Sequence, residues 1–191
     1  MKKIIIGLLV FVVLLIGAYA VKTYVYAPAP TGTNHNAGIY TSRPFGISFI
    51  YPKGYYLKER TDVGTPERPQ LSVLLVEDTP ENRDLVNGVS KDVREGPTAI
   101  TVDAYPNPEA LSARDWMSKD TNWTIRTSEV TDVTVGTTTG ASYRWSGLYE
   151  GKSTVVTHGT HAYVFSVTWM TASDAILKDY DTLLTSVAFP S

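Results

Sequence analysis

Two histidines, His158 and His161, flank a Gly-Thr turn and are the candidate metal ligands of the chain. Protein zinc sites use three or four side-chain ligands in total, so this pair alone is too small to hold an ion. The sequence contains no cysteine, which excludes thiolate ligands, disulfides and thiol catalysis. We therefore interpret both histidines as polar turn residues and predict neither a metal site nor a cofactor.

Sequence patterns of covalent and acid–base catalysis are also missing. Ser48 and Ser142 each follow a glycine by two positions, but neither is followed by the second glycine of the hydrolase elbow G-x-S-x-G. The sequence has no HExxH motif and no glycine-rich phosphate loop. Glu77 and Asp78 are consecutive at the end of a predicted strand, so their side chains point to opposite faces and are not placed to flank one glycosidic bond. The sequence thus predicts a protein without catalytic activity.

The polar segment 78–98 carries the candidate interaction residues. Prolines and glycines interrupt it, and Thr79 with Pro80 predicts the start of one short helix. Long polar loops between strands often carry binding sites, but such a loop also costs little to close and is tolerated as a plain insertion, so both interpretations stay open. The candidate partner-binding residues are Glu81, Arg83, Asp84, Lys91, Asp92, Arg94 and Glu95.

Strands on both sides of this segment are predicted to form one sheet. Residues 45–52 are an aromatic and β-branched run that ends at Pro52, which predicts the first strand. Residues 71–76 are apolar on both alternating faces, as in a strand covered on both sides, whereas residues 99–105 alternate and predict one buried face. Short connections favour antiparallel hairpins for the rest of the chain. Further strands are predicted at 130–135, 141–149, 153–157 and 160–170, with turns at Gly136, Gly151 and Gly159.

Two helices are predicted to cover this sheet. Asn107 and Pro108 are the cap and first residue of a helix that ends near Thr121. Ser173 is predicted to cap the last helix, which carries an unbroken apolar stripe. The stripe consists of Ile176, Leu177, Tyr180, Leu183, Leu184 and Val187. The sequence therefore predicts an α+β fold in which an antiparallel β-sheet has layers on both faces.

An apolar segment at residues 4–21 lies between two N-terminal lysines and Lys22. At about 1.5 Å per helical residue its length approaches the roughly 30 Å of the bilayer core, which predicts one N-terminal transmembrane helix within residues 1–22. The lysine asymmetry predicts a single-pass protein of the cell membrane, with a cytoplasmic N-terminus and the domain outside. The sequence Ala18-Tyr19-Ala20 leaves one alternative open, a signal segment cleaved behind Ala20 that releases a secreted protein.

The rest of the chain is predicted to be a linker and one ordinary domain. Residues 23–38 contain proline, glycine and asparagine without hydrophobic periodicity and predict a flexible linker, which leaves 39–191 as an extracytoplasmic domain. The chain carries 17 Lys and Arg against 19 Asp and Glu, and three of its lysines flank the apolar segment. The acidic balance of the domain argues against nucleic acid as a partner.

Several short motifs follow one another in the domain in a recognisable order. They are Phe49-Ile50-Tyr51-Pro52, Ile100-Thr101-Val102 before a helix with Trp116, Val133-Thr134-Val135-Gly136, Tyr163-Val164-Phe165, and Ser186-Val187-Ala188-Phe189. This order is similar to that of the PsbP-like domain, over about residues 45–189. The resemblance implies an α/β/α sandwich with helices packed on both faces of the sheet, and a non-enzymatic accessory or assembly role. The chain departs from the family in lacking a lipid-accepting cysteine, and no photosystem partner is implied.

Two function classes follow from these observations. The first is a membrane-anchored extracytoplasmic binding or assembly-accessory module, without catalytic activity, whose partner is an envelope protein. The alternative is a cell-envelope hydrolase with an active site that no sequence motif reveals. A deep pocket with convergent titratable groups would favour the hydrolase, and a shallow surface would favour the binding module.

Overall fold

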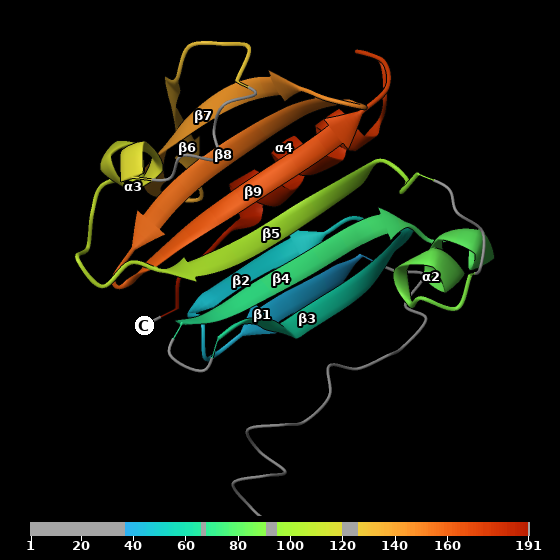
Figure 1. Cartoon of the computed structure of the whole chain (residues 1–191), viewed down its shortest axis with the longest axis horizontal. Coiled ribbons are helices and arrows are strands. Elements are labelled where there is room, and N and C mark those ends of the chain that lie inside the picture. Colours follow the sequence, from blue (N-terminus) through green and yellow to red (C-terminus); the bar gives the residue numbers. More distant parts are fainter. Residues whose placement is uncertain (1–36, 66–67, 91–94, 120–125, 191) are drawn as a thin grey trace, which may run out of the picture. The chain divides into compact units, whose positions relative to one another are not determined.

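The computed structural model describes residues 37–65, 68–90, 95–119 and 126–190 (Figure 1). The predicted membrane helix, the signal cleavage position behind Ala20 and nearly all of the linker lie outside these residues. Within the described part of the chain, no helix combines the length and the apolar content needed to cross a bilayer. The described residues form three helices and nine strands, and the strands make two sheets.

The larger sheet has seven strands in the order β3-β4-β5-β9-β8-β7-β6, and each strand is antiparallel to its neighbours. Its strands are β3 (Tyr55–Thr65), β4 (Arg68–Glu77), β5 (Ala99–Pro106), β6 (Thr131–Val135), β7 (Thr138–Ser146), β8 (Glu150–His158) and β9 (His161–Trp169). The sequence patterns predict β4 to β9 and miss β3, an edge strand rich in charged residues. The predicted turn at Gly151 is wrong, because Gly151 lies inside β8 and the turn comprises residues 147–149.

A two-stranded sheet precedes β3 in the sequence. β1 (Gly38–Ser42) pairs antiparallel with β2 (Ile47–Tyr51), and Ser48 of β2 forms a further bridge to Ala188. The strand predicted at 45–52 is confirmed as β2. β1 is an addition that the sequence does not predict, and it starts at the last residue of the predicted linker.

Helices cover both faces of the seven-stranded sheet. α4 (Ile176–Ser186) packs on one face, here called the inner face, together with the β1–β2 hairpin. α3 (Ala113–Lys119) packs on the opposite, outer face, and α2 (Pro80–Val86) follows β4. The predicted α+β class is confirmed, and the β1–β2 hairpin is an additional cover of the inner face.

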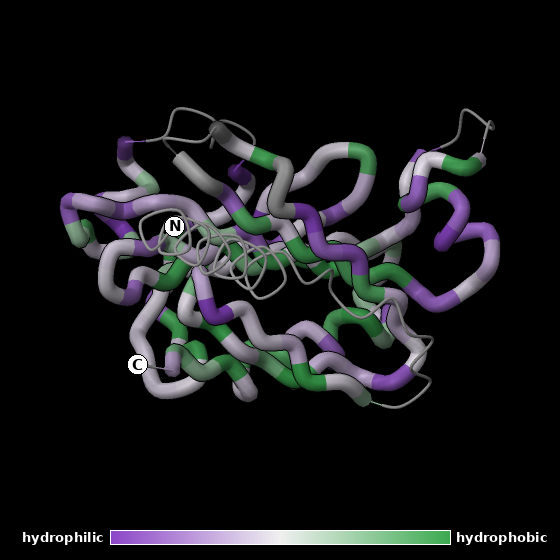
Figure 2. The backbone as a smooth tube through the Cα atoms, turned by 90° about the horizontal axis from the view of Figure 1, so that it is seen from below, coloured by the Kyte–Doolittle hydropathy of each residue, from purple (hydrophilic) through white to green (hydrophobic). Residues whose placement is uncertain are grey.

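The main hydrophobic core lies between the inner face and its cover. Alternate residues of β4, β5 and β9 are fully buried there, as the strand periodicity predicts. They are Leu71, Val73, Leu75, Ile100, Val102, Ala104, Tyr163, Phe165 and Val167. The apolar stripe of α4 packs against them through Tyr180 and Leu183. Figure 2 shows hydrophobic residues running through the interior and hydrophilic residues prominent in the loops.

The outer face of β4 is less well covered. Ser72 and Leu74 are only half-buried there, so the prediction that the strand at residues 71–76 is covered on both sides holds in part.

A smaller core on the outer face fixes α3, which starts later than predicted. Ala113 and Met117 pack there against residues of β7, β8 and β9. The predicted cap at Asn107 is wrong, because this side chain bonds to the N–H (3.1 Å) and the carbonyl (3.0 Å) of Leu111 and braces a turn. The hydroxyl of Ser112 accepts instead from the helix N–H of Asp115 at 3.2 Å.

The start of α4 also differs from the prediction. The helix begins at Ile176 without a side-chain cap, so the predicted cap at Ser173 is wrong. The Asp174 carboxylate instead accepts hydrogen bonds from the N–H groups of Met170 (2.8 Å) and Thr171 (3.1 Å). Hydrogen bonds from Thr171, its hydroxyl first, hold the pKa of Asp174 below its ordinary value. This carboxylate therefore closes the loop before the helix rather than capping the helix itself.

Candidate functional site

α2 is formed by local capping rather than by burial. Thr79 is its N-cap, and the Asn82 N–H donates to the Thr79 hydroxyl oxygen at 3.2 Å. Pro80 follows as the first helical residue, which confirms the predicted start. No residue of α2 is buried. Short helices are marginal without packing, so polar contacts must hold this one in place.

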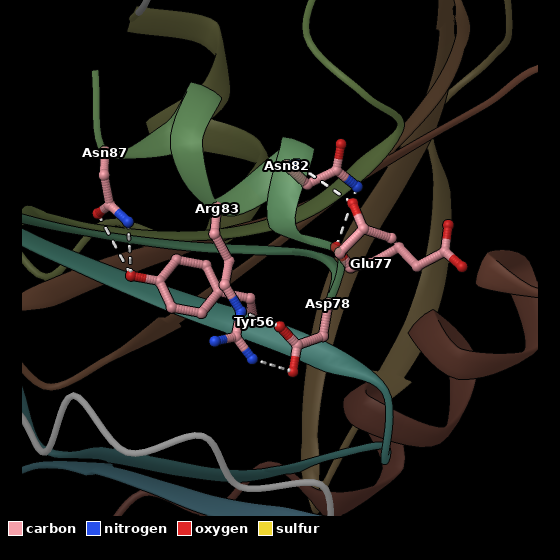
Figure 3. A network of polar contacts seen from close by, with 7 residues as sticks. Tyr56, Glu77, Asp78, Asn82, Arg83 and Asn87 are labelled. Atoms are coloured by element: carbon pink, nitrogen blue, oxygen red, sulfur yellow. Dashed lines mark hydrogen bonds and ion pairs between the residues drawn. The ribbon is translucent and has the colours of Figure 1, made fainter. Parts of the chain in front are cut away.

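Polar side chains attach α2 to β3 and to the end of β4 (Figure 3). Arg83 forms an ion pair with Asp78, whose side chain is only 6% exposed, with one N–O distance of 2.7 Å. The Arg83 guanidinium lies 5.4 Å from the centroid of the Tyr56 ring. The hydrogen bond to Asp78 raises the pKa of Arg83. Asn87 donates to the Tyr56 hydroxyl at 3.1 Å and accepts from the Lys58 ammonium at 3.1 Å. These contacts hold α2 against the sheet although it buries no apolar side chain.

The predicted interaction residues divide into three groups in the structure. Arg83 is half-buried and its charge is paired with Asp78 inside the domain. Glu81 and Asp84 of α2 and Glu95 before β5 are exposed. Lys91, Asp92 and Arg94 lie outside the described residues. Glu81, Asp84 and Glu95 are therefore exposed acidic side chains, whereas Arg83 has a structural role.

Other loops leave the sheet at the end where α2 lies. Val76 pairs with Ala99, Ile100 pairs with Val167, and Glu150 pairs with Trp169. This register places the turn 147–149 and the loop 170–175 at the same end as the segment between β4 and β5. The Tyr149 hydroxyl donates to the Gly96 carbonyl at 2.7 Å, which ties this turn to the loop before β5.

Each of these loops carries an exposed apolar side chain. Among the described residues five large hydrophobic side chains are exposed, and three of them, Val89 (65%), Leu148 (64%) and Met170 (72%), lie at this end. We define the α2-end surface as Glu81, Asp84, Val89, Glu95, Leu148 and Met170. The charge pattern of the sequence predicts the acidic residues of the α2-end surface, but it does not predict Leu148 and Met170. A large apolar residue directly after the turn glycine Gly147 is the signal that would have found Leu148.

The two histidines lie at the opposite end of the sheet. His158 and His161 are cross-strand partners at the turn between β8 and β9. The His158 ring stacks on Phe189 with centroids 4.9 Å apart, and His161 lies edge-on to Phe45 at 5.8 Å. Burial lowers the pKa of His161. Within the described residues no three His, Cys, Asp or Glu side chains form a group that could hold an ion, so we assign both rings to an aromatic cluster.

Titratable groups with raised pKa values lie on both faces of the sheet. Burial raises the pKa of Asp103 on the outer face, where Ser72 and Thr101 hydrogen-bond to it. Burial also raises the pKa of Tyr180, whose hydroxyl donates to the Phe165 carbonyl at 2.9 Å in the inner core. Catalytic sites bring such groups together in one cleft. Here the sheet separates them, so these two groups do not serve each other as acid and base.

Comparison with known proteins gives a fold but no family assignment. No model of a known protein family matches the chain, and no curated protein matches it. A crystal structure from Bacteroides thetaiotaomicron matches 82% of the chain at 13% identity with a TM-score of 0.52, and the chain spans about half, 49%, of that protein. The solution structure of cyanobacterial PsbP from Synechocystis matches 85% of the chain and 96% of its own length, at 14% identity with a TM-score of 0.49.

The crystal structure from Bacteroides shares the fold, and an identity this low carries no statement about activity. A cyanobacterial PsbP is among the matching structures, as the order of motifs in the sequence predicts. The likeness to it is remote, and no partner is transferred from it to this chain.

Proposed function

We propose that this chain is a non-catalytic binding module that contacts a protein partner through the α2-end surface. The observation that carries the proposal is the exposure of Val89, Leu148 and Met170 at one end of the sheet, beside a helix without a buried side chain. Exposed apolar groups rimmed by polar residues are typical of interaction sites. Since Glu81, Asp84 and Glu95 are exposed at this end, we expect a partner that places basic residues near an apolar contact.

The surroundings of Ser142, one of the two serine candidates, support binding over hydrolysis. A serine hydrolase needs a base beside its nucleophile. Ser142 is buried, its hydroxyl donates to the Ser153 carbonyl at 2.9 Å, and it accepts from the Thr154 hydroxyl at 3.1 Å. These neighbours orient the hydroxyl as a structural link between β7 and β8 and supply no base to it.

We further propose that the domain works outside the cytoplasm, tethered to the membrane, and that its partner is an envelope protein. The support is the apolar segment 4–21 with its lysine asymmetry. A flexible linker such as 23–38 has an end-to-end distance of roughly 20 Å. The linker would therefore keep the domain close to the membrane surface, where we expect it to meet its partner.

Site-specific photo-crosslinking in the native host tests the contact surface. A photoreactive amino acid at Val89 or Leu148 of the full-length chain should capture one discrete partner protein. Ile39 and Ile50 provide matched control positions, because they are exposed and apolar but belong to the β1–β2 hairpin. Equal capture from the control positions, or no capture from the α2-end surface, would reject it as the interface.

Replacing the segment 79–97 by a short Gly/Ser linker gives an independent test. No buried side chain of α2 is lost, and combining the replacement with Asp78→Asn avoids leaving the Asp78 carboxylate without Arg83, so we expect a folded domain. Capture through a photoreactive group at Leu148 should fall strongly in this variant. If the variant is stable and captures the partner as well as the parent does, α2 is not part of the interface.

A further inference from the structure

Two cations face each other across neighbouring strands of the inner face. Arg144 of β7 and Lys152 of β8 are direct cross-strand partners. Such partners point to the same face with Cβ atoms about 5 Å apart, and like charges in this position destabilise the sheet. The Lys152 side chain is only 30% exposed, so water screens its charge incompletely. The pair therefore has an energetic cost in the isolated domain.

Aromatic rings hold both cations in place. The Arg144 guanidinium lies 5.9 Å from the centroid of the Trp169 ring, and the Lys152 ammonium lies 5.4 Å from the centroid of the Tyr180 ring. Asp181 of α4 approaches Lys152 at 3.6 Å, which is a long ion pair to an exposed carboxylate. Among the described residues no carboxylate forms an ion pair with Arg144. The positive charge of the pair is thus only partly compensated.

Both cations line an open hollow of about 360 Å³. Its lining also includes Ser128 and Thr131, whose hydroxyl groups donate to the backbone carbonyls of Glu129 and Ser142, and Glu129, whose exposed carboxylate adds one negative charge. The Ser128 hydroxyl oxygen accepts from the Arg144 N–H at 2.8 Å, and the hydroxyl donates to the Glu129 carbonyl at 3.0 Å, so both bonds fix this residue beside β7. The hollow thus combines a planar guanidinium and an ammonium.

We propose that this hollow binds a small oxyanion, a phosphate or carboxylate group, between Arg144 and Lys152. The guanidinium offers two parallel N–H donors to such a group, and the ammonium adds a point charge from the neighbouring strand. A bound anion would cancel the repulsion of the pair, which explains why two like charges occupy directly opposite positions. The site lies on the inner face and is independent of the α2-end surface.

Titration of the full-length chain with inorganic phosphate and with succinate, at constant ionic strength and with chloride as the reference, tests the proposal. Backbone amide NMR signals of residues 142–144 and 150–154 should shift in a saturable way with at least one of the two anions. The anion that saturates first identifies the ligand class. Shifts that grow linearly with both anions, without saturation, would overturn the proposal.

Three variants sharpen this test. Arg144→Gln should weaken anion binding about tenfold, because one charge-assisted pair of hydrogen bonds is lost. Glu129→Gln should strengthen it about threefold by removing the negative charge of the hollow. Lys178→Gln, which removes an exposed cation of α4 outside the hollow, should leave the affinity unchanged. Equal affinities of the parent and Arg144→Gln would reject the site.

Thermal unfolding supplies a second readout that does not depend on the choice of anion. Arg144→Gln loses the contact with Trp169 at every salt concentration, but it also removes the repulsion from Lys152, which salt screens. Without added ligand, the melting temperature of Arg144→Gln relative to the parent should therefore be highest at low ionic strength and should fall as salt is added. A relative melting temperature that is independent of salt, or that rises with salt, would show that the pair is not strained and would contradict the proposal.

Discussion

His161 packs beside Phe45 and resists protonation because burial lowers its pKa below the ordinary value of 6.5. Between its lowered pKa and 6.5 the unfolded chain binds more protons than the folded domain, so stability rises with pH in this range. The contribution of His161 is complete above pH 6.5 and is lost as pH falls through the lowered folded-state pKa. His161→Gln should therefore flatten the pH dependence of the free energy of unfolding, measured with urea between pH 5 and pH 7.5.

His158 provides the control for this prediction. It lies opposite His161 at the same turn but is exposed, and its ring stacks on Phe189. His158→Gln should keep the slope that His161→Gln removes. If both variants keep the slope of the parent, His161 does not carry the pH dependence.

Gly136 and Gly159 share a left-handed backbone with φ +56 in two neighbouring hairpin turns. A Cβ at Gly136 would lie 2.1 Å from the Val187 carbonyl oxygen, whereas a Cβ at Gly159 would meet nothing within 4 Å. Gly136→Ala should cost roughly 2–4 kcal/mol through strain and a clash with the end of α4, and Gly159→Ala about 1 kcal/mol through strain alone. Equal losses of unfolding free energy in chemical denaturation would mean that the backbone after α4 shifts to make room for the added Cβ.

At the scale of the elements, α4 is the helix on which the inner core depends. Leu183 is fully buried at the centre of its stripe. Leu183→Ala should cost about 2–5 kcal/mol, because it removes buried methyl groups and leaves a cavity. Thr185→Ala is the control, since Thr185 is exposed on the same helix, and we expect a change within about 0.5 kcal/mol. A loss below about 0.5 kcal/mol for Leu183→Ala, measured by urea unfolding, would contradict the packing of the stripe.

Elements with strong hydrophobic periodicity could be predicted from the sequence, and others could not. β5, β9 and α4 show regular alternation or an apolar stripe, because one of their faces is buried along the full length. In β1 the buried positions include Gly38 and Ser42 while Ile39 is exposed, and β3 carries several charged residues, so neither strand shows an apolar alternation. Asn107 and Ser173 are of the residue type that caps helices, but neither is a cap here. Asn107 bonds to Leu111 while Ser112 accepts from the first turn of α3, and α4 begins without a side-chain cap.

At the scale of the whole molecule, the membrane topology remains a prediction from the lysine asymmetry. Protease added to intact cells, or to spheroplasts where an outer membrane is present, should degrade the domain while a cytoplasmic marker protein survives. Degradation only after lysis would reverse the predicted orientation. A mature N-terminus at Val21 would show instead that the apolar segment is a cleaved signal.

The interaction surface could be predicted only in part, because it is assembled by the topology. α2 and its acidic side chains lie in one segment of sequence, and local capping signals are enough to find them. Leu148 and Met170 belong to separate loops that reach the same end of the sheet only through the strand order β5-β9-β8-β7. The same limit applies to Arg144 and Lys152, because their apposition depends on the register of one hairpin.

The bridge between Ser48 and Ala188 has a consequence for the order in which the domain closes. The Ile50 N–H donates to the Ser186 hydroxyl, across 136 residues of sequence. During synthesis the β1–β2 hairpin leaves the ribosome long before α4 does, so Ile47 and Phe49 have no complete cover until residue 188 has emerged. Closure of the inner core therefore waits for residues far along the chain and depends on the slow search for long-range contacts.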